Sequence, residues 1–201
     1  NTGSLQNLQL QNTIGAPVAT TEVETNVNVD ADVAPIDVAA LGYFDNTTVP
    51  FNRTDPSTYN HVTATTIYDS LGAPHEAQMY FRKVDEYAGV PATPQGTHPN
   101  MWQMFTFVDG VQLAPSDTGA AGGAGSATPF SVLRFNNDGT LLDSRYIDGT
   151  ATEVTSTVAE EMVFEDYDVP DLKTGAAAIQ FKIDFSGTTQ FGSDFAVNTI
   201  N

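Results

Sequence analysis

Residues 59–83 limit the possible folds of this chain more than any other stretch. The first half is rich in β-branched side chains, which are stiff at χ1 and fit a pleated strand better than a helix. The second half alternates with a period of two: Ala77, Met79 and Phe81 lie on one face, and Glu76, Gln78, Tyr80 and Arg82 on the other. Residues 69–74, between the halves, contain Asp, Ser, Gly and Pro, which favour a turn. The stretch therefore predicts a β-hairpin.

Other segments predict further strands. Residues 21–30 and 179–185 alternate in the same way, with inward positions Val23, Thr25, Val27, Val29, Ile179, Phe181, Ile183 and Phe185. Residues 101–108 form a nearly continuous apolar run that contains the single tryptophan, which is typical of a strand buried on both sides. Turn signals at 109–110 and 136–139 predict tight turns, the second within a hairpin over 130–142. We therefore predict an all-β fold: one antiparallel β-barrel-like or sandwich domain with long loops and little helix.

The composition excludes several classes of function. The 201 residues suit one domain, large enough to bury roughly 70% of its unfolded surface. The chain has no cysteine, so disulfides, thiolate metal sites and a cysteine nucleophile are excluded. Its net charge is −18, from 7 Lys and Arg against 25 Asp and Glu, which disfavours binding to nucleic acids and to anionic membranes. Since the chain begins with Asn1 rather than Met, we expect a fragment of a longer protein.

Candidate chemical sites are weak. The histidines His61, His75 and His98 do not have the spacing of metal ligands. We expect His61 and His75 to lie at the outer ends of one hairpin region, where they could approach each other. Residues 114–128 are rich in Ala and Gly; they predict a flexible surface loop rather than a phosphate-binding loop, because no Gly-Lys-Ser/Thr motif is present. The turn at 136–139 lacks the complete ligand pattern of a calcium loop.

The densest acidic patch lies within residues 160–171 and comprises Glu160, Glu161, Glu165, Asp166, Asp168 and Asp171. A solvated rim is the favoured interpretation. A calcium site and a glycosidase-like carboxylate pair are the alternatives. We predict no catalytic, cofactor-binding or metal-binding residue, and no enzymatic activity.

Five segments together resemble the bacterial flagellar hook protein family. They read FNRTDPSTYNH at 51–61, TTIYDSLGAPHE at 65–76, MYFRK at 79–83, RFNNDGTL at 134–141 and IDFSGTTQFGSDFAVN at 183–198. The resemblance implies a barrel-like outer domain over residues 21–198. It also implies that residues 1–20 link to an inner domain and that residues 199–201 begin the return to it. The Pro-rich residues 85–100 and the loop at 114–128 depart from the family pattern.

The resemblance also implies a function. The chain would be the surface-exposed domain of a structural subunit in the flagellar hook, the flexible joint that transmits motor torque to the filament. Expected partners are other copies in a helical tube, together with the hook cap, the distal rod and the hook–filament junction proteins. The location would be extracellular after export by the flagellar type III pathway, and the isolated fragment would be monomeric. The alternative is a carbohydrate-binding or adhesin-like module, which would need exposed aromatics such as Trp102, Tyr43 and Tyr87.

Overall fold

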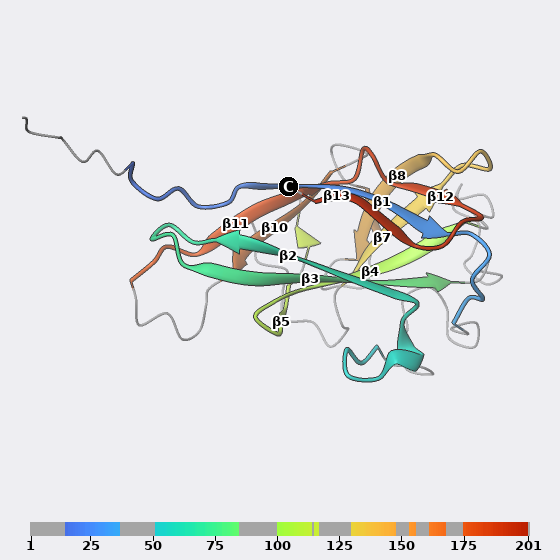
Figure 1. Ribbon diagram of the computed structural model, residues 1–201, viewed down its shortest axis with the longest axis horizontal. Coiled ribbons are helices and arrows are strands. Elements are labelled where there is room, and N and C mark those ends of the chain that lie inside the picture. Colours follow the sequence, from blue (N-terminus) through green and yellow to red (C-terminus); the bar gives the residue numbers. More distant parts are fainter. Residues whose placement is uncertain are drawn as a thin grey trace, which may run out of the picture.

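The structure is a computed structural model that describes residues 15–36, 51–84, 100–113, 115–116, 130–147, 153–155, 161–167 and 175–200 (Figure 1). In these ranges the regular elements are strands and one short 3₁₀ helix, Pro56–Thr58. No helix among them is long and apolar enough to cross a membrane. The strands are β1 (Glu22–Asp30), β2 (His61–Tyr68), β3 (Pro74–Val84), β4 (Met101–Val108), β5 (Val111–Gln112), β6 (Pro115–Ser116), β7 (Ser131–Phe135), β8 (Leu141–Ile147), β9 (Glu153–Thr155), β10 (Glu161–Tyr167), β11 (Ile179–Asp184), β12 (Thr189–Phe191) and β13 (Ala196–Ile200).

The strands form two sheets. The first has the order β12-β1-β11-β10-β6, with β13 also paired to β1, and the second has the order β2-β3-β4-β7-β8-β9, with β5 paired to β4. The all-β prediction is confirmed. The second sheet is antiparallel as predicted. The first sheet is mixed, because β1 runs parallel to both β11 and β12.

β11 and β12 are two halves of one strand beside β1. Glu22 pairs with Lys182 and Asn28 pairs with Thr189, so the partner strand holds one residue more than β1 over the same span. Such an extra residue is a β-bulge, which bends a strand and increases its twist. The hydroxyl of Thr188, inside the bulge, donates to the carbonyl of Thr25 at 3.0 Å and fills the interrupted ladder.

The two sheets pack face to face and join at two corners. At one corner the amide of Thr20 donates to the carbonyl of Tyr68 at 2.9 Å, which links the start of β1 to the end of β2. At the other corner Thr140 forms an isolated bridge with Thr189, and the amide of Gln190 donates to the carbonyl of Gly139 at 2.8 Å. The architecture thus combines features of a sandwich and of a barrel, which were the two alternatives predicted from the sequence.

The main core lies between the sheets and contains the predicted inward side chains of β1 and β11, together with Trp102. The indole N–H of Trp102 donates to Gln190 Oε1 at 3.1 Å and so ties the two sheets together within the core. Strand β4 is buried at every position, as predicted for residues 101–108.

The face of β3 that carries Glu76, Gln78, Tyr80 and Arg82 is only partly exposed to solvent. Glu76 is exposed, but Tyr80 and Arg82 are buried. A second apolar cluster covers this outer face of the sheet, with Phe51 stacked on Phe105 at 4.0 Å between ring centroids. Burial lowers the pKa of Arg82 to about 10, and its Nε donates to Gln103 Oε1 at 2.8 Å. The alternating pattern therefore predicted the strand correctly, but it did not predict that Tyr80 and Arg82 on its polar face are buried.

Both predicted hairpins are present. β2 and β3 flank the turn at 69–73, and β7 and β8 flank the turn at 136–140. β8 continues to Ile147, beyond the predicted hairpin over 130–142, and pairs with β9. The β4–β5 turn at Asp109 and Gly110 has positive φ at both residues (48° and 81°), as an Asp-Gly hairpin turn requires.

Candidate functional site at the β2–β3 turn

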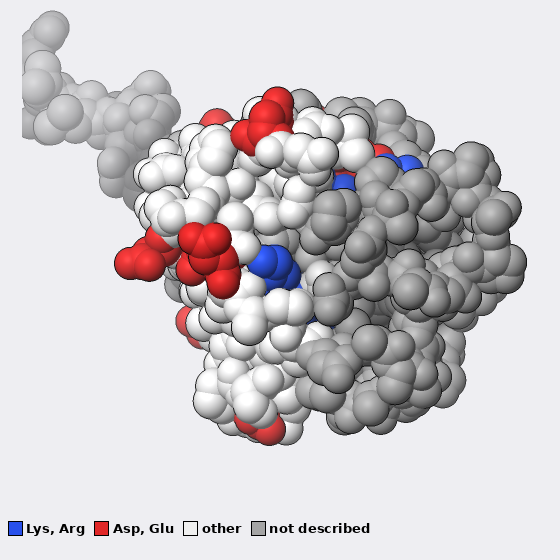
Figure 2. Space-filling view, turned by 90° about the vertical axis from the view of Figure 1, so that its right-hand side faces the viewer, with Lys and Arg blue, Asp and Glu red and all other residues white. Residues whose placement is uncertain are grey.

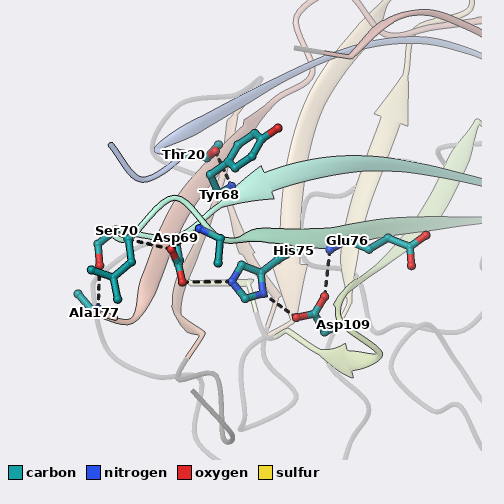
Figure 3. A network of polar contacts seen from close by, with 10 residues as sticks. Thr20, Tyr68, Asp69, Ser70, His75, Glu76, Asp109 and Ala177 are labelled. Carbon is teal, nitrogen blue, oxygen red and sulfur yellow. Dashed lines mark hydrogen bonds and ion pairs between the residues drawn. The ribbon is translucent and has the colours of Figure 1, made fainter. Parts of the chain in front are cut away.

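A network of polar contacts surrounds His75 at the tip of the β2–β3 hairpin (Figure 3). The imidazole is 6% exposed, and each ring nitrogen faces a carboxylate. Nδ1 lies 2.6 Å from Asp109 Oδ2, and Nε2 lies 3.5 Å from Asp69 Oδ2. In the described part of the chain the ring contacts carboxylates and no hydroxyl, so it is not arranged as the base of a nucleophile.

Asp69 organises the turn itself. It is fully buried, and its Oδ1 accepts from the amides of Leu71 and Ala73, each at 2.8 Å. Gly72 follows with φ of 81°, a conformation that glycine adopts without strain. Burial raises the pKa of Asp69, but the amides of Ala73 and Leu71 together with His75 outweigh that effect and hold the pKa below its usual value.

Asp109 brings the β4–β5 turn into the same network. Its Oδ1 accepts from the amide of Glu76 at 3.0 Å, and its own amide donates to the carbonyl of Glu76 at 3.0 Å. Asp109 therefore fixes the turn to the start of β3 through its backbone and its side chain, with its second oxygen left for His75.

Two hydroxyls extend the network to the first sheet. Ser70 Oγ accepts from the amide of Ala177, just before β11, at 2.9 Å. Thr20 Oγ1 accepts from the amide of Tyr68 at 2.9 Å. The tip is thus tied to the segment before β1, to the segment before β11 and to the β4–β5 turn, as Figure 3 shows.

The same tip carries large exposed apolar side chains, Val18 (80% exposed), Tyr68 (47%) and Leu71 (53%). A Cβ added at Gly72 would lie 3.0 Å from Pro17 Cβ, so the segment before β1 packs directly on the turn. Isolated exposed apolar residues are ordinary on protein surfaces, whereas their concentration at one tip makes it a candidate contact surface.

The prediction that His61 and His75 could approach each other is wrong. His61 pairs with Phe81 and His75 pairs with Ile67, so the histidines lie six residues apart along the hairpin, about 20 Å. The ring of His61 stacks on Phe195 at 4.6 Å between centroids, and burial lowers its pKa against the opposing effect of Asp30. His98 lies outside the described residues.

The acidic patch is only partly described. Glu161, on β10, pairs with Lys182 at 3.0 Å, and Lys182 also reaches Glu22 at 3.3 Å. These two carboxylates raise the pKa of Lys182. The structure does not describe the other acidic side chains of the patch, those of Glu160, Glu165, Asp166, Asp168 and Asp171. Residues 117–128 of the Ala/Gly-rich loop also lie outside the described residues. No group of three potential metal ligands occurs among the described residues.

One face of the domain carries several acidic side chains. Figure 2 shows one face on which Asp and Glu side chains protrude and the few basic groups lie beside them. Trp102 is fully buried and belongs to no exposed aromatic row. Tyr43 and Tyr87, the other aromatics considered for a sugar site, lie outside the described residues.

Comparison with known proteins gives a family match over most of the chain. Residues 28–201 match the model of the flagellar basal body protein FlaE D2 domain. The flagellar hook protein FlgE of Escherichia coli strain K12 is 28% identical over 147 residues, which cover 73% of this chain and 28% of that protein. The hook protein FlgE of Salmonella typhimurium is 24% identical over 184 residues, covering 91% of this chain and 33% of that protein.

The chain thus spans about a third or less of the length of these relatives. Among solved structures, a 32 kDa fragment of the flagellar hook protein FlgE from Caulobacter crescentus aligns over 71% of this chain and 46% of its own, with a TM-score of 0.42 and 16% identity.

Proposed function

Because the chain belongs to the family of the flagellar basal body protein FlaE D2 domain, we propose that it is the outer β domain of a flagellar hook subunit. The observation that carries this proposal is the match over residues 28–201, which includes every strand from β2 to β13 and the end of β1. The relatives named as flagellar hook proteins support the same assignment. The role is structural rather than catalytic.

The fold is consistent with a domain inserted into a longer subunit. β13 runs antiparallel to β1, with Ile200 opposite Thr25, so the strands nearest the two ends of the described chain lie side by side. A domain with adjacent termini can be inserted into another domain at low cost. In this proposal residues 1–20 and 199–201 connect to the inner domain, and residues 21–198 form the outer one.

In the hook this domain contacts other copies of itself in a helical tube outside the cell, after export by the flagellar type III pathway. The hook cap, the distal rod and the hook–filament junction proteins complete the assembly. A flexible joint needs stiff subunits whose mutual contacts exchange readily. The domain suits this requirement, because its core is apolar while its net charge of −18 opposes tight, permanent contacts.

These 201 residues contain no cysteine, so single cysteines introduced into them permit a direct test in the full-length subunit on intact cells, with the unsubstituted subunit labelled in parallel as the background. Single cysteines at two exposed positions at opposite ends of the domain, Leu71→Cys and Asn137→Cys, are treated with a membrane-impermeant fluorescent maleimide. The matched control is Val108→Cys, whose side chain is fully buried. We expect label from at least one exposed site on short hooks at the cell surface, and none from the control.

Expressed protein that stays unlabelled at both exposed sites on intact cells, but reacts after lysis, would contradict an extracellular hook. Label spread over the whole cell surface would favour an adhesin-like module instead. For the isolated chain, sedimentation that does not change with concentration and matches a monomer is expected.

A further inference from the structure

We propose that His61 forms a pH-sensitive contact between the two sheets: its neutral ring holds Phe195, and with it the start of β13, against the second sheet, and protonation of the ring releases this contact. The start of β13 then separates from the second sheet while the pairing of the other strands is kept. The inference rests on the geometry of a ring stack and is independent of the proposed function.

A stack of aromatic rings joins the two sheets at the start of β2. The centroid of the His61 ring lies 4.6 Å from that of Phe195, with 11° between the ring planes, and 5.8 Å from that of Trp102, with 27° between the planes. His61 and Trp102 belong to β2 and β4 of the second sheet, whereas Phe195 directly precedes β13 of the first sheet. His61 therefore connects the start of β13 to the core at Trp102.

The start of β13 depends on this stack more than the rest of the strand does. Among the described strands β13 pairs only with β1, and a register shift interrupts that ladder. The first two residues of β13 lie beyond the shift and are exposed. Ile200, at the other end of β13, packs against the main core. Phe195 therefore attaches the start of β13 to the second sheet, through His61 and through Phe81 at 6.0 Å between centroids.

The surroundings of the His61 ring disfavour a second proton. Nε2 is buried and has no hydrogen-bond partner. A neutral ring with its proton on Nδ1 leaves only a lone pair at Nε2, whereas the charged ring places an N–H there with no acceptor. Burial accordingly lowers the pKa of His61, and the carboxylate of Asp30, which favours the charged form, has the smaller effect.

The other charged groups on the elements around the ring are directed elsewhere. On β3, Lys83 donates to backbone carbonyls of the segment after β1, and Arg82 lies on the opposite face of the sheet. Asp194, next in sequence to Phe195, is exposed. Apart from His61 itself, β2 and β4 carry no ionisable group but Tyr68, at the far end of β2. Asp30 is thus the charge that opposes burial at this ring.

The sign of the pH dependence follows from the two states of the ring. When Phe195 is released, the imidazole is solvated and titrates near its ordinary pKa of about 6.5. In the stack its pKa is lower. The contact is therefore fully stable above about pH 6.5 and weakens as the pH falls toward the lowered pKa, with the opening equilibrium rising by up to about tenfold per pH unit.

The experiment is NMR spectroscopy of the isotopically labelled 201-residue chain, recorded from pH 8 to pH 5. The His61 ring should titrate with a midpoint below about 6.5, and the nuclear Overhauser effects between the rings of Phe195 and Phe81 should weaken as it does. The amide of Gln190, on the other side of β1 from β13, should keep its exchange rate after correction for the intrinsic rate.

Two results would overturn the proposal. A His61 midpoint at or above about 6.5 would show that the aromatic faces stabilise the cation. A contact between Phe195 and Phe81 that persists through the titration of His61 would show that the ring does not control the start of β13.

The variant His61→Phe keeps an aromatic ring in the stack and removes the ionisable group. The contact between Phe195 and Phe81 should then persist from pH 8 to pH 5. Loss of this contact in acid in the variant would assign the pH dependence to another group, against the proposal.

Two carboxylate variants test the electrostatics without altering the stack. Asp30 and Asp184 each accept the amide two residues further along at 2.8 Å, which asparagine also does. Asp30→Asn removes the charge that favours protonated His61, so the midpoint should shift to lower pH. Asp184 pairs with Glu24, six residues before Asp30 and about 20 Å from it, so Asp184→Asn should leave the midpoint unchanged. Equal midpoints in the two variants would contradict the placement of the His61 ring beside Asp30.

Discussion

Replacing Gly139 with alanine should weaken the corner where the β7–β8 turn meets β12. Gly139 has φ of 83°, and a Cβ added there would lie 2.6 Å from the carbonyl oxygen of Gln190 and 2.6 Å from the ring of Phe191. The carbonyl of Gly139 also accepts from the amide of Gln190 at 2.8 Å. Because the contact with Gln190 is with a backbone oxygen, rotating the Phe191 side chain cannot relieve it.

The cost has two parts. Alanine at a positive φ costs about 1–2 kcal/mol. Displacing the Gln190 backbone adds the loss of a buried hydrogen bond and strain, on the order of 1–2 kcal/mol. Gly175→Ala separates these parts, because Gly175 has a similar φ of 74° but nothing within 4 Å of the added Cβ. We expect about 3 kcal/mol for Gly139→Ala and about 1 kcal/mol for Gly175→Ala.

Urea denaturation followed by the fluorescence of Trp102 measures both variants, because the indole is buried and bonded to Gln190 at the affected corner. In thermal melts each kcal/mol corresponds to about 2–4 °C for a domain of this size. A third variant, Gly139→Ala with Phe191→Ala, removes the ring contact but not the carbonyl contact and should recover little stability. Equal losses for the two glycine variants would refute the close approach of the sheets at this corner.

Three further predictions concern buried polar groups. Asn28→Ala should cost about 1–3 kcal/mol in urea denaturation, because the side-chain amide accepts from the amide of Phe191 and donates to the carbonyl of Ser193. Asn28→Asp should cost at least as much, because it keeps the acceptor but turns a buried carboxylate oxygen toward the Ser193 carbonyl. Arg134 lowers the pKa of Asp143 despite the burial of this carboxylate. The ion pair therefore stabilises the fold fully above about pH 4, and its contribution is lost as the pH falls. Asp143→Asn should cost about 3–5 kcal/mol at pH 7 and flatten the acid branch of a stability–pH curve. Trp102→Phe should leave Gln190 Oε1 without its donor and also leave a cavity, because phenylalanine is smaller than the fully buried indole, for a loss of about 2–4 kcal/mol by thermal melting.

The strands β1, β2, β3, β4, β7 and β11 and the turns between them followed from local patterns, because period-two alternation and the Asp-Gly and Asn-Asp-Gly turns act over a few residues. β10 was not predicted as a strand, because its sequence belongs to the acidic patch that was interpreted as a solvated rim. The pairing of β1 with β11, β12 and β13 did not follow from local patterns. Its alternation is compatible with either direction of pairing, and the bulge at 185–188 that aligns β12 with β1 is visible only as a register difference of one residue. The burial of Arg82 was missed for the same reason, since the cluster that covers it includes Phe51, remote in sequence.

The network at His75 was likewise hidden from sequence reasoning. Asp69 was recognised as a turn residue and Asp109 as part of a second turn, but only the pairing of Ala77 with Val108 brings the β4–β5 turn beside His75. A lone histidine between two predicted turns carries no signal of its own until the strand register is known.

The two ends of the domain are stabilised by different physics, and this makes the response to pH a local one. The corner at Gly139 depends on backbone contacts with no titratable group, whereas the tip at His75 depends on an imidazole between two carboxylates. About 30 Å of extended chain separates them, from Thr20 just before β1 to Val29 near its end. Because the pKa of Asp69 is held below its usual value and Asp69 accepts from the amide of Leu71, acid pH should accelerate amide exchange at Leu71 and leave the amide of Gln190 unchanged. If both accelerated together, the turn held by Asp69 would have to support the packing of the two sheets as a whole, and the local account of its role would fail.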